Sequence, residues 1–154
     1  MRPLLLLIAF ALASCGGPSA RFATTDASAD EAAVASLISR HRQAHGLGPV
    51  SPNPRLTRMA LAQARANAAI GELSHDAGGS FEARLASFGA GKVHAAENLG
   101  AGAASEAEAI TRWTRSSEHN KNLLLPQAKA FGIARVDAPS TRYKRFWALI
   151  LADG

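Results

Sequence analysis

The sequence predicts an α+β domain in which helices come first and antiparallel strands come last. Apolar residues recur every three or four positions over 28–46 and again over 53–71, which is the period of an amphipathic helix. Two alternating runs, 130–136 and 145–152, close the chain with the period of paired strands. Because helices and strands occupy separate halves of the chain, a sandwich is favoured over βαβ units with a parallel sheet.

The first helix is predicted to begin near Ser28, where Ser-Ala-Asp-Glu forms a capping box with Glu31. Gly46 supplies its stop, and three prolines then impose a connecting segment. The pair Asn53-Pro54 places a cap and a proline at the start of the second helix, which ends at Gly71. His75 therefore lies on a loop or at a helix margin.

The middle of the chain is predicted to hold shorter elements. A short helix covers 80–88, a loop follows over 89–92, and 95–99 forms a strand or an extended piece. Ser105 opens a further helix through a second capping box, and Ser116 or Ser117 caps a short turn that carries His119. These elements place His119 on a helical turn just before the closing strands.

The first 14 residues are predicted to be a signal peptide. Arg2 precedes an apolar run over 4–12, and small residues follow it. The run is shorter than the ~20 residues of a spanning helix. A buried helix of the domain is the alternative reading, but the basic start and the small residues favour export.

Cys15 is the only cysteine, so the chain forms no intramolecular disulfide. The residues 12–15, Leu-Ala-Ser-Cys, resemble a bacterial lipobox, which implies cleavage before Cys15 and lipidation of its sulfur; a free thiol is the alternative. Two acyl chains on one residue suffice for stable membrane attachment. Gly16 at the next position resembles lipoproteins of the outer membrane. We therefore expect a lipid anchor in the cell envelope, a flexible tether over 15–27 and a folded domain over 28–154.

The net charge of +5 comes from basic residues scattered along the chain. There is no long basic run and no base-stacking motif, so the sequence argues against nucleic acid as a partner. Contact with anionic envelope polymers or lipid head groups fits this charge better.

Three separated residues, His75, Glu97 and His119, are the candidate metal ligands. Imidazole binds zinc near neutral pH, a carboxylate completes a mixed shell, and water takes an open position. The residues lie far apart in sequence, so only folding brings them together, and ordinary surface or capping histidines are the alternative. Asn98 is expected to bond backbone and Trp113 to lie in the core.

The chain from about residue 34 to 151 resembles the CAP superfamily, which includes cysteine-rich secretory proteins, insect venom antigens, plant pathogenesis-related proteins and short bacterial forms. Five local matches carry this resemblance in the expected order, and they span nearly all of the predicted domain: Arg42 with Gly46-Leu47 and Pro49-Val50, the helix that ends before Ser74-His75, Glu97-Asn98-Leu99 with Gly102, Trp113 with Ser116 to Leu124, and the Gly132-Ile133-Ala134 and Phe146-Trp147-Ala148 strands.

The resemblance implies a three-layer α-β-α sandwich with a surface cleft of two histidines and acidic residues, which in some members binds zinc or another divalent cation. Carried over by position, the cleft residues are His75, Glu97 and His119. The fourth position, a Glu in eukaryotic members, is Ser116 here. Glu118, beside His119, is the substitute to consider.

Three functions compete. The first is a non-enzymatic module, tethered to the envelope, that binds a lipid or an envelope polymer at the cleft, as the resemblance to lipid-binding members implies. The second is a structural or interaction protein with an inherited cleft. The third is a zinc-dependent hydrolase with Glu97 as ligand or general base. No catalytic residue is assigned, because Ser116 and Ser117 lack the surroundings of a nucleophile.

Overall fold

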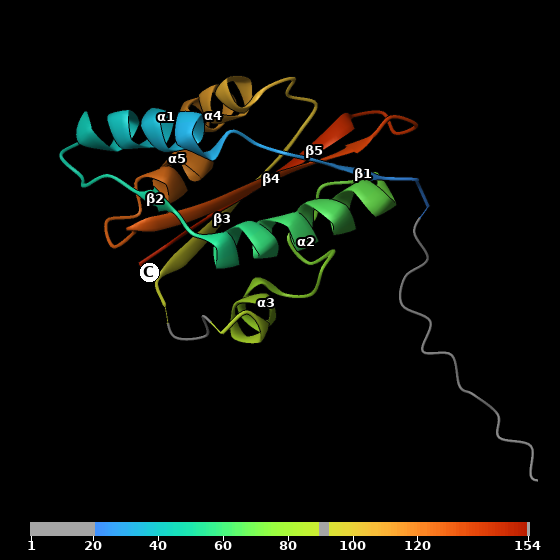
Figure 1. The fold of residues 1–154 in the computed structure, drawn as a ribbon, viewed down its shortest axis with the longest axis horizontal. Coiled ribbons are helices and arrows are strands. Elements are labelled where there is room, and N and C mark those ends of the chain that lie inside the picture. The colour runs from blue at the N-terminus through green and yellow to red at the C-terminus, as the bar shows by residue number, and fades with distance from the viewer. Residues whose placement is uncertain (1–20, 90–92, 154) are drawn as a thin grey trace, which may run out of the picture.

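The computed structural model describes residues 21–89 and 93–153 of the 154-residue chain. The predicted signal peptide over 1–14, the lipidation site Cys15 and residues 16–20 of the predicted tether lie outside the described residues. Helices cover both faces of one mainly antiparallel sheet (Figure 1), so the predicted α+β class is confirmed. Within the described ranges, no helix has the length and apolar character needed to cross a bilayer.

The sheet is built around two long strands at its centre. Strands β4 (Ala130–Ala138) and β5 (Lys144–Ala152) pair antiparallel, and β3 (Ala95–Ala101) pairs antiparallel with β5. The short strands β1 (Thr25–Ala27) and β2 (Ser51–Pro52) both pair with β4, which gives the order β1-β4-β5-β3 with β2 beside β4. The two predicted closing strands are confirmed.

Strand β1 lies inside the segment that the sequence analysis assigned to the tether. Thr25 pairs with Asp137 of β4, so the sheet begins before Ser28, where the domain was expected to start. Asp26 forms an ion pair with Arg65, which lies on the second long helix. A three-residue strand is too short to show an alternating pattern, and backbone bonds to β4 hold it, so the sequence carried no signal for it.

Two long helices follow the predicted boundaries with one correction. Helix α1 (Glu31–Gln43) is capped by Asp30, whose side chain accepts a hydrogen bond from the Ala33 amide, and not by Ser28. Helix α2 (Pro54–Ile70) begins after the predicted Asn53 cap and ends at Gly71, whose φ of 74° is left-handed.

Three shorter helices complete the two outer layers. Helix α3 (Phe81–Ser87) packs with α2 against one face of the sheet, and α4 (Glu106–Arg115) and α5 (Ser117–Leu123) pack with α1 against the other. Figure 1 shows the sheet between these two groups. The three-layer α-β-α sandwich is therefore the observed architecture.

Strand β5 supplies the centre of both cores. Its side chains alternate between the two faces, and all of those from Phe146 to Ala152 are buried. One face meets α2 and α3, and the other meets α1, α4 and α5. This alternation is the pattern that predicted the strand.

Arg42 joins α1 to the segment that follows α5. Its guanidinium is fully buried and donates hydrogen bonds to four backbone carbonyls, those of Gly48, Leu123, Leu125 and Ala128. Burial lowers the pKa of Arg42, but an arginine starts far above neutrality and stays charged. Carbonyls at a helix end are a favourable partner for this cation.

Gly132 is the point of closest approach between α2 and β4. A Cβ atom placed there would lie 2.1 Å from the carbonyl carbon of Leu56 and from the amide of Thr57. Both atoms are backbone, so neither moves without moving the helix. Only glycine lets α2 pack at this distance.

We expect Gly132→Ala to lower the free energy of unfolding by at least about 3 kcal/mol, because the added methyl overlaps helix backbone. Gly48→Ala is the matched control, since a Cβ there meets nothing within 4 Å. Urea denaturation of both variants measures the difference. Equal midpoints for the two variants would show that α2 does not press on β4 at this residue.

Candidate functional site

The centre of the site is a buried carboxylate that faces α3. Glu97 on β3 is 5% exposed and receives both arms of the Arg84 guanidinium, at 2.6 Å to Oε2 and 2.9 Å to Oε1. His75 Nδ1 lies 2.8 Å from the same Oε1. Three donors therefore engage the two oxygens of Glu97.

Arg84 is the functional residue that sequence reasoning missed. It is 5% exposed, and besides Glu97 it donates to the carbonyls of Gly79 and His75, at 3.0 and 2.9 Å. One guanidinium thus fixes the loop that carries His75 to the strand that carries Glu97. The position of Arg84 in the sequence could have indicated that it is buried. Arg84 lies beside Leu85 and three residues after Phe81, on the buried side of a short amphipathic helix.

Two polar side chains of α2 hold the same loop from the other side. Gln63 Nε2 donates to the Ser74 carbonyl at 2.6 Å, and Asn67 Oδ1 accepts from the Ser74 amide at 3.0 Å. Both side chains are fully buried. A polar pair four residues apart on an otherwise apolar helix face is the sequence signal for such a role.

His119 is positioned from the opposite layer. It lies on α5, and its Nδ1 is 2.8 Å from Ser116 Oγ. The Asn98 side chain, fully buried on β3, donates to the His119 carbonyl at 3.0 Å and accepts from Asn122 at 2.9 Å. Asn98 therefore bonds backbone, as expected, but it does so across layers and not within its own loop.

The unpaired edge of β3 is covered by side chains from α4 and α5. Its alternate carbonyls at Glu97, Leu99 and Ala101 accept hydrogen bonds from Asn122, Trp113 and Arg112 respectively, at 3.1, 2.9 and 3.0 Å. These bonds place both helices at the sheet edge and remove acceptors that would otherwise pair with another strand. Trp113 is buried, as predicted.

Burial and neighbouring charges both act on the His119 ring. Burial lowers the pKa of His119 below its usual value of 6.5, the charge of nearby His75 lowers it further, and the charge of Glu118 opposes both effects. His119 is consequently neutral at pH 7. The His75 side chain is 58% exposed, so the pair opens to solvent.

The hydrogen bonds assign the tautomer of His75. Because Nδ1 faces the carboxylate of Glu97, it carries the proton and Nε2 carries the lone pair. His119 also uses Nδ1 for its contact, with Ser116. Within the described residues, the Nε2 atom of neither ring has a hydrogen-bond partner in the protein.

Ser116 and Glu118, the other two predicted residues of the site, form no hydrogen bond with Glu97 or His75 in the described chain. Ser116 is at the cap position of α5, but its hydroxyl contacts the His119 ring and makes no capping bond. Glu118 pairs with Lys121, and its side chain is 77% exposed. Among residues 21–89 and 93–153, no three His, Cys, Asp or Glu side chains are arranged to hold one metal ion. The structure thus joins His75 to Glu97 and His119 to Ser116.

Solved structures of bacterial proteins share this fold. An outer surface protein from Borrelia burgdorferi is similar with a TM-score of 0.72 and 16% identity, over 84% of this chain and 98% of that one. An extracellular protein with an SCP domain from Bacillus anthracis has a TM-score of 0.68 and 22% identity, over 80% of this chain and 40% of that one. A cysteine-rich secretory protein from Staphylococcus aureus has a TM-score of 0.63 and 19% identity, over 80% and 38%.

This chain therefore spans less than half the length of two of these proteins. No curated protein matches it. The family model of the cysteine-rich secretory proteins, CAP, matches residues 35–151. This range covers His75, Glu97 and His119, and it leaves out only β1, the start of α1 and the last residue of β5 among the helices and strands. The chain belongs to the CAP family.

Proposed function

We propose that this CAP domain is a non-enzymatic ligand-binding module of the cell envelope, with a divalent metal site at His75 and His119. The proposal rests on the hydrogen bonds that the Glu97 carboxylate accepts. Its oxygens are used by Arg84 and His75, which turns the Nε2 atom of His75 outward. The site then offers the Nε2 atoms of two imidazole rings to an incoming group.

This arrangement fits a metal site in which Glu97 acts behind the ligands. A histidine that binds metal commonly donates its other ring proton to a carboxylate, which fixes the ring and raises its basicity. Direct ligation by Glu97, the role expected from the sequence, would require it to give up a bond to Arg84 or His75. Two imidazoles leave open positions on a four-coordinate ion, and an acidic or polar group of the bound ligand fills them.

The geometry favours binding over hydrolysis. A zinc hydrolase needs a base within reach of the metal-bound water. Here Glu97 forms a buried ion pair with Arg84, and Glu118 pairs with Lys121 at the surface. The contact between Ser116 and His119 resembles the serine and histidine of a catalytic triad. The Glu97 carboxylate, however, contacts His75 and not His119. Activation of Ser116 would need a carboxylate that contacts His119.

We expect the chain to bind zinc in a calorimetric titration at pH 7, and His75→Ala or His119→Ala to abolish the heat. His94→Ala is the matched control, because His94 pairs with Asp153 away from the cleft. Glu97→Gln should weaken binding by about 10–100-fold, the usual cost of losing a carboxylate behind a ligating histidine.

The pH dependence of the same titration has a defined sign. Protonation removes the lone pair that binds metal, and the lowered pKa of His119 keeps that ring neutral to below pH 6.5. The contribution of His119 to zinc affinity should therefore be lost as the pH drops below about 6.5. Equal heats for wild type and both cleft variants would remove the metal site and favour a structural role for the domain.

The envelope part of the proposal rests on Cys15 and the apolar run before it. For the ligand we propose a lipid or an envelope polymer. Leu73, two residues before His75, is 44% exposed, one of two large apolar side chains at the surface of the described chain. An exposed apolar side chain two residues from His75 suits a ligand with both an apolar part and a polar end.

Mass spectrometry of protein extracted from its own envelope tests both statements. The denatured mass should equal that of a chain beginning at Cys15 with a diacylglyceryl group, and Cys15→Ser should abolish this form. The native mass should exceed the denatured mass by a constant ligand, which His119→Ala loses. An unmodified Cys15 would refute the anchor, and equal native and denatured masses would refute the bound ligand.

A further inference from the structure

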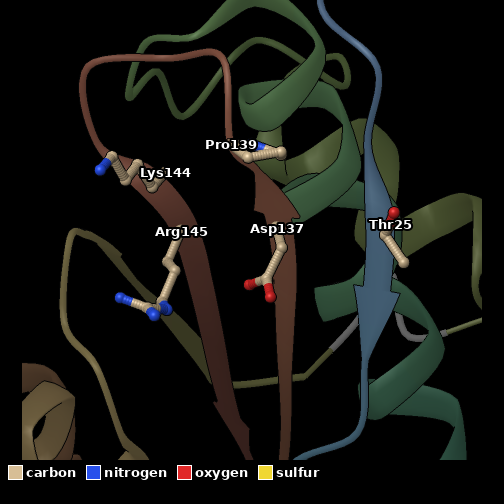
Figure 2. A pocket seen from close by; sticks show the side chains of 5 residues that line it. All are labelled: Thr25, Asp137, Pro139, Lys144 and Arg145. Carbon is tan, nitrogen blue, oxygen red and sulfur yellow. The ribbon is translucent and has the colours of Figure 1, made fainter.

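A recess lies at the opposite end of the sheet from Glu97. It encloses about 370 Å³ and is lined by Thr25, Asp137, Pro139, Lys144 and Arg145. Thr25 pairs with Asp137, and Asp137 pairs with Arg145, so these three side chains form one row across β1, β4 and β5. Figure 2 shows this row with Lys144 above it at the hairpin turn.

The recess is separate from the histidine site. Glu97 pairs with Ile150, five residues along β5 from Arg145, which corresponds to roughly 17 Å of strand. Glu97 and Arg145 also lie on different faces of the sheet, since Glu97 faces α3 and Arg145 shares the face of Trp147. The recess therefore needs its own explanation.

The turn between β4 and β5 carries excess positive charge. Arg135 Nε lies 3.0 Å from Asp137 Oδ1, and Arg135 Nη2 donates a hydrogen bond to Asp137 Oδ2 at 3.3 Å, so the carboxylate of the recess is already compensated. Within the described chain, Arg142, Lys144 and Arg145 form no ion pair with a carboxylate. Three cations are thus left at one tip.

An exposed aromatic ring accompanies these cations. Tyr143 is 39% exposed, and the Arg142 guanidinium lies 5.5 Å above its ring. Tyrosine with neighbouring basic residues is typical of surfaces that sit at the head-group level of a membrane. We refer to Arg142, Tyr143, Lys144 and Arg145 as the basic tip.

The backbone of the basic tip is held in a strained conformation. Lys144 has φ of 64°, the one positive value for a residue other than glycine in the described chain. Its amide donates to Thr141 Oγ1 at 2.9 Å, and the Arg145 amide donates to the Tyr143 carbonyl at 2.8 Å. Strain that the surrounding bonds maintain is more frequent at binding sites than elsewhere.

The chain enters the domain at the same end as the basic tip. Because β1 runs antiparallel to β4, Thr25 lies beside the last residues of β4, and the amides of Arg21 and Phe22 bond the Ala69 carbonyl at the end of α2. Arg21 is six residues after Cys15. Six residues reach roughly 20 Å at most, so an acyl group on Cys15 holds this end of the domain near the bilayer.

We propose that the basic tip docks on anionic phospholipid head groups, and that the recess beside Arg145 receives a head-group phosphate. The inference rests on the lipid anchor of the proposed function, which brings the tip to the bilayer. Cationic side chains next to an anionic surface supply the attraction, and Tyr143 enters the interface. Docking at this end leaves the histidine cleft on the part of the domain away from the lipid.

Vesicle sedimentation tests the proposal with the mature chain, residues 15–154, carrying Cys15→Ser so that no acyl group contributes. The chain should sediment with vesicles of phosphatidylcholine mixed with phosphatidylglycerol and not with phosphatidylcholine alone. The double variant Lys144→Gln, Arg145→Gln should partition about thirtyfold more weakly, as expected from two basic residues at an anionic surface. Thermal melting checks that each variant is folded.

The matched control is Arg55→Gln, Arg58→Gln, which removes the same charge from the start of α2, at the other end of the sheet. It should bind within about twofold of the parent chain, allowing for general charge. Equal weakening by both pairs would overturn the basic tip as the docking site. Inorganic phosphate should displace the chain from the vesicles more than chloride does at equal ionic strength, because it competes for the recess, and equal displacement by the two anions would overturn the recess as a phosphate site. Neither result depends on acylation or on zinc, so the proposed function stands or falls separately.

Discussion

The buried ion pair between Glu97 and Arg84 is the interaction on which the site depends. A carboxylate in a protein interior is costly unless it is paired and its remaining lone pairs are used, and Arg84 and His75 together meet that demand. The same guanidinium also binds the His75 and Gly79 carbonyls. Loss of Arg84 would therefore release the loop, the strand and the imidazole together.

Adjacent residues on one edge strand serve the two outer layers. Side chains alternate along a strand, so Glu97 reaches the layer of α2 and α3 while Asn98 reaches α5. Each orients one histidine, His75 through its ring and His119 through its backbone carbonyl. The site is thus built where the three layers meet, and its geometry follows from the register of β3 on β5.

The order of helices and strands could be read from the sequence because period and capping residues are local signals. Asn53-Pro54, Gly71 and the alternation in β5 each act within a few residues. Strand β1 could not be found, since backbone pairing to β4 alone defines it. The association of His75 with Glu97 followed from family resemblance, whereas the buried role of Arg84 depends on a contact 13 residues away that no local pattern specifies.

The central claim is that Glu97 fixes His75 with its Nε2 atom free for a ligand. Long-range nitrogen–proton NMR spectra of the metal-free protein, at a pH above the usual histidine pKa of about 6.5, report which ring nitrogen carries the proton. The account predicts that neutral His75 is protonated at Nδ1 and bare at Nε2. A spectrum in which Nε2 carries the proton would contradict it, because the carboxylate would then not be holding the ring.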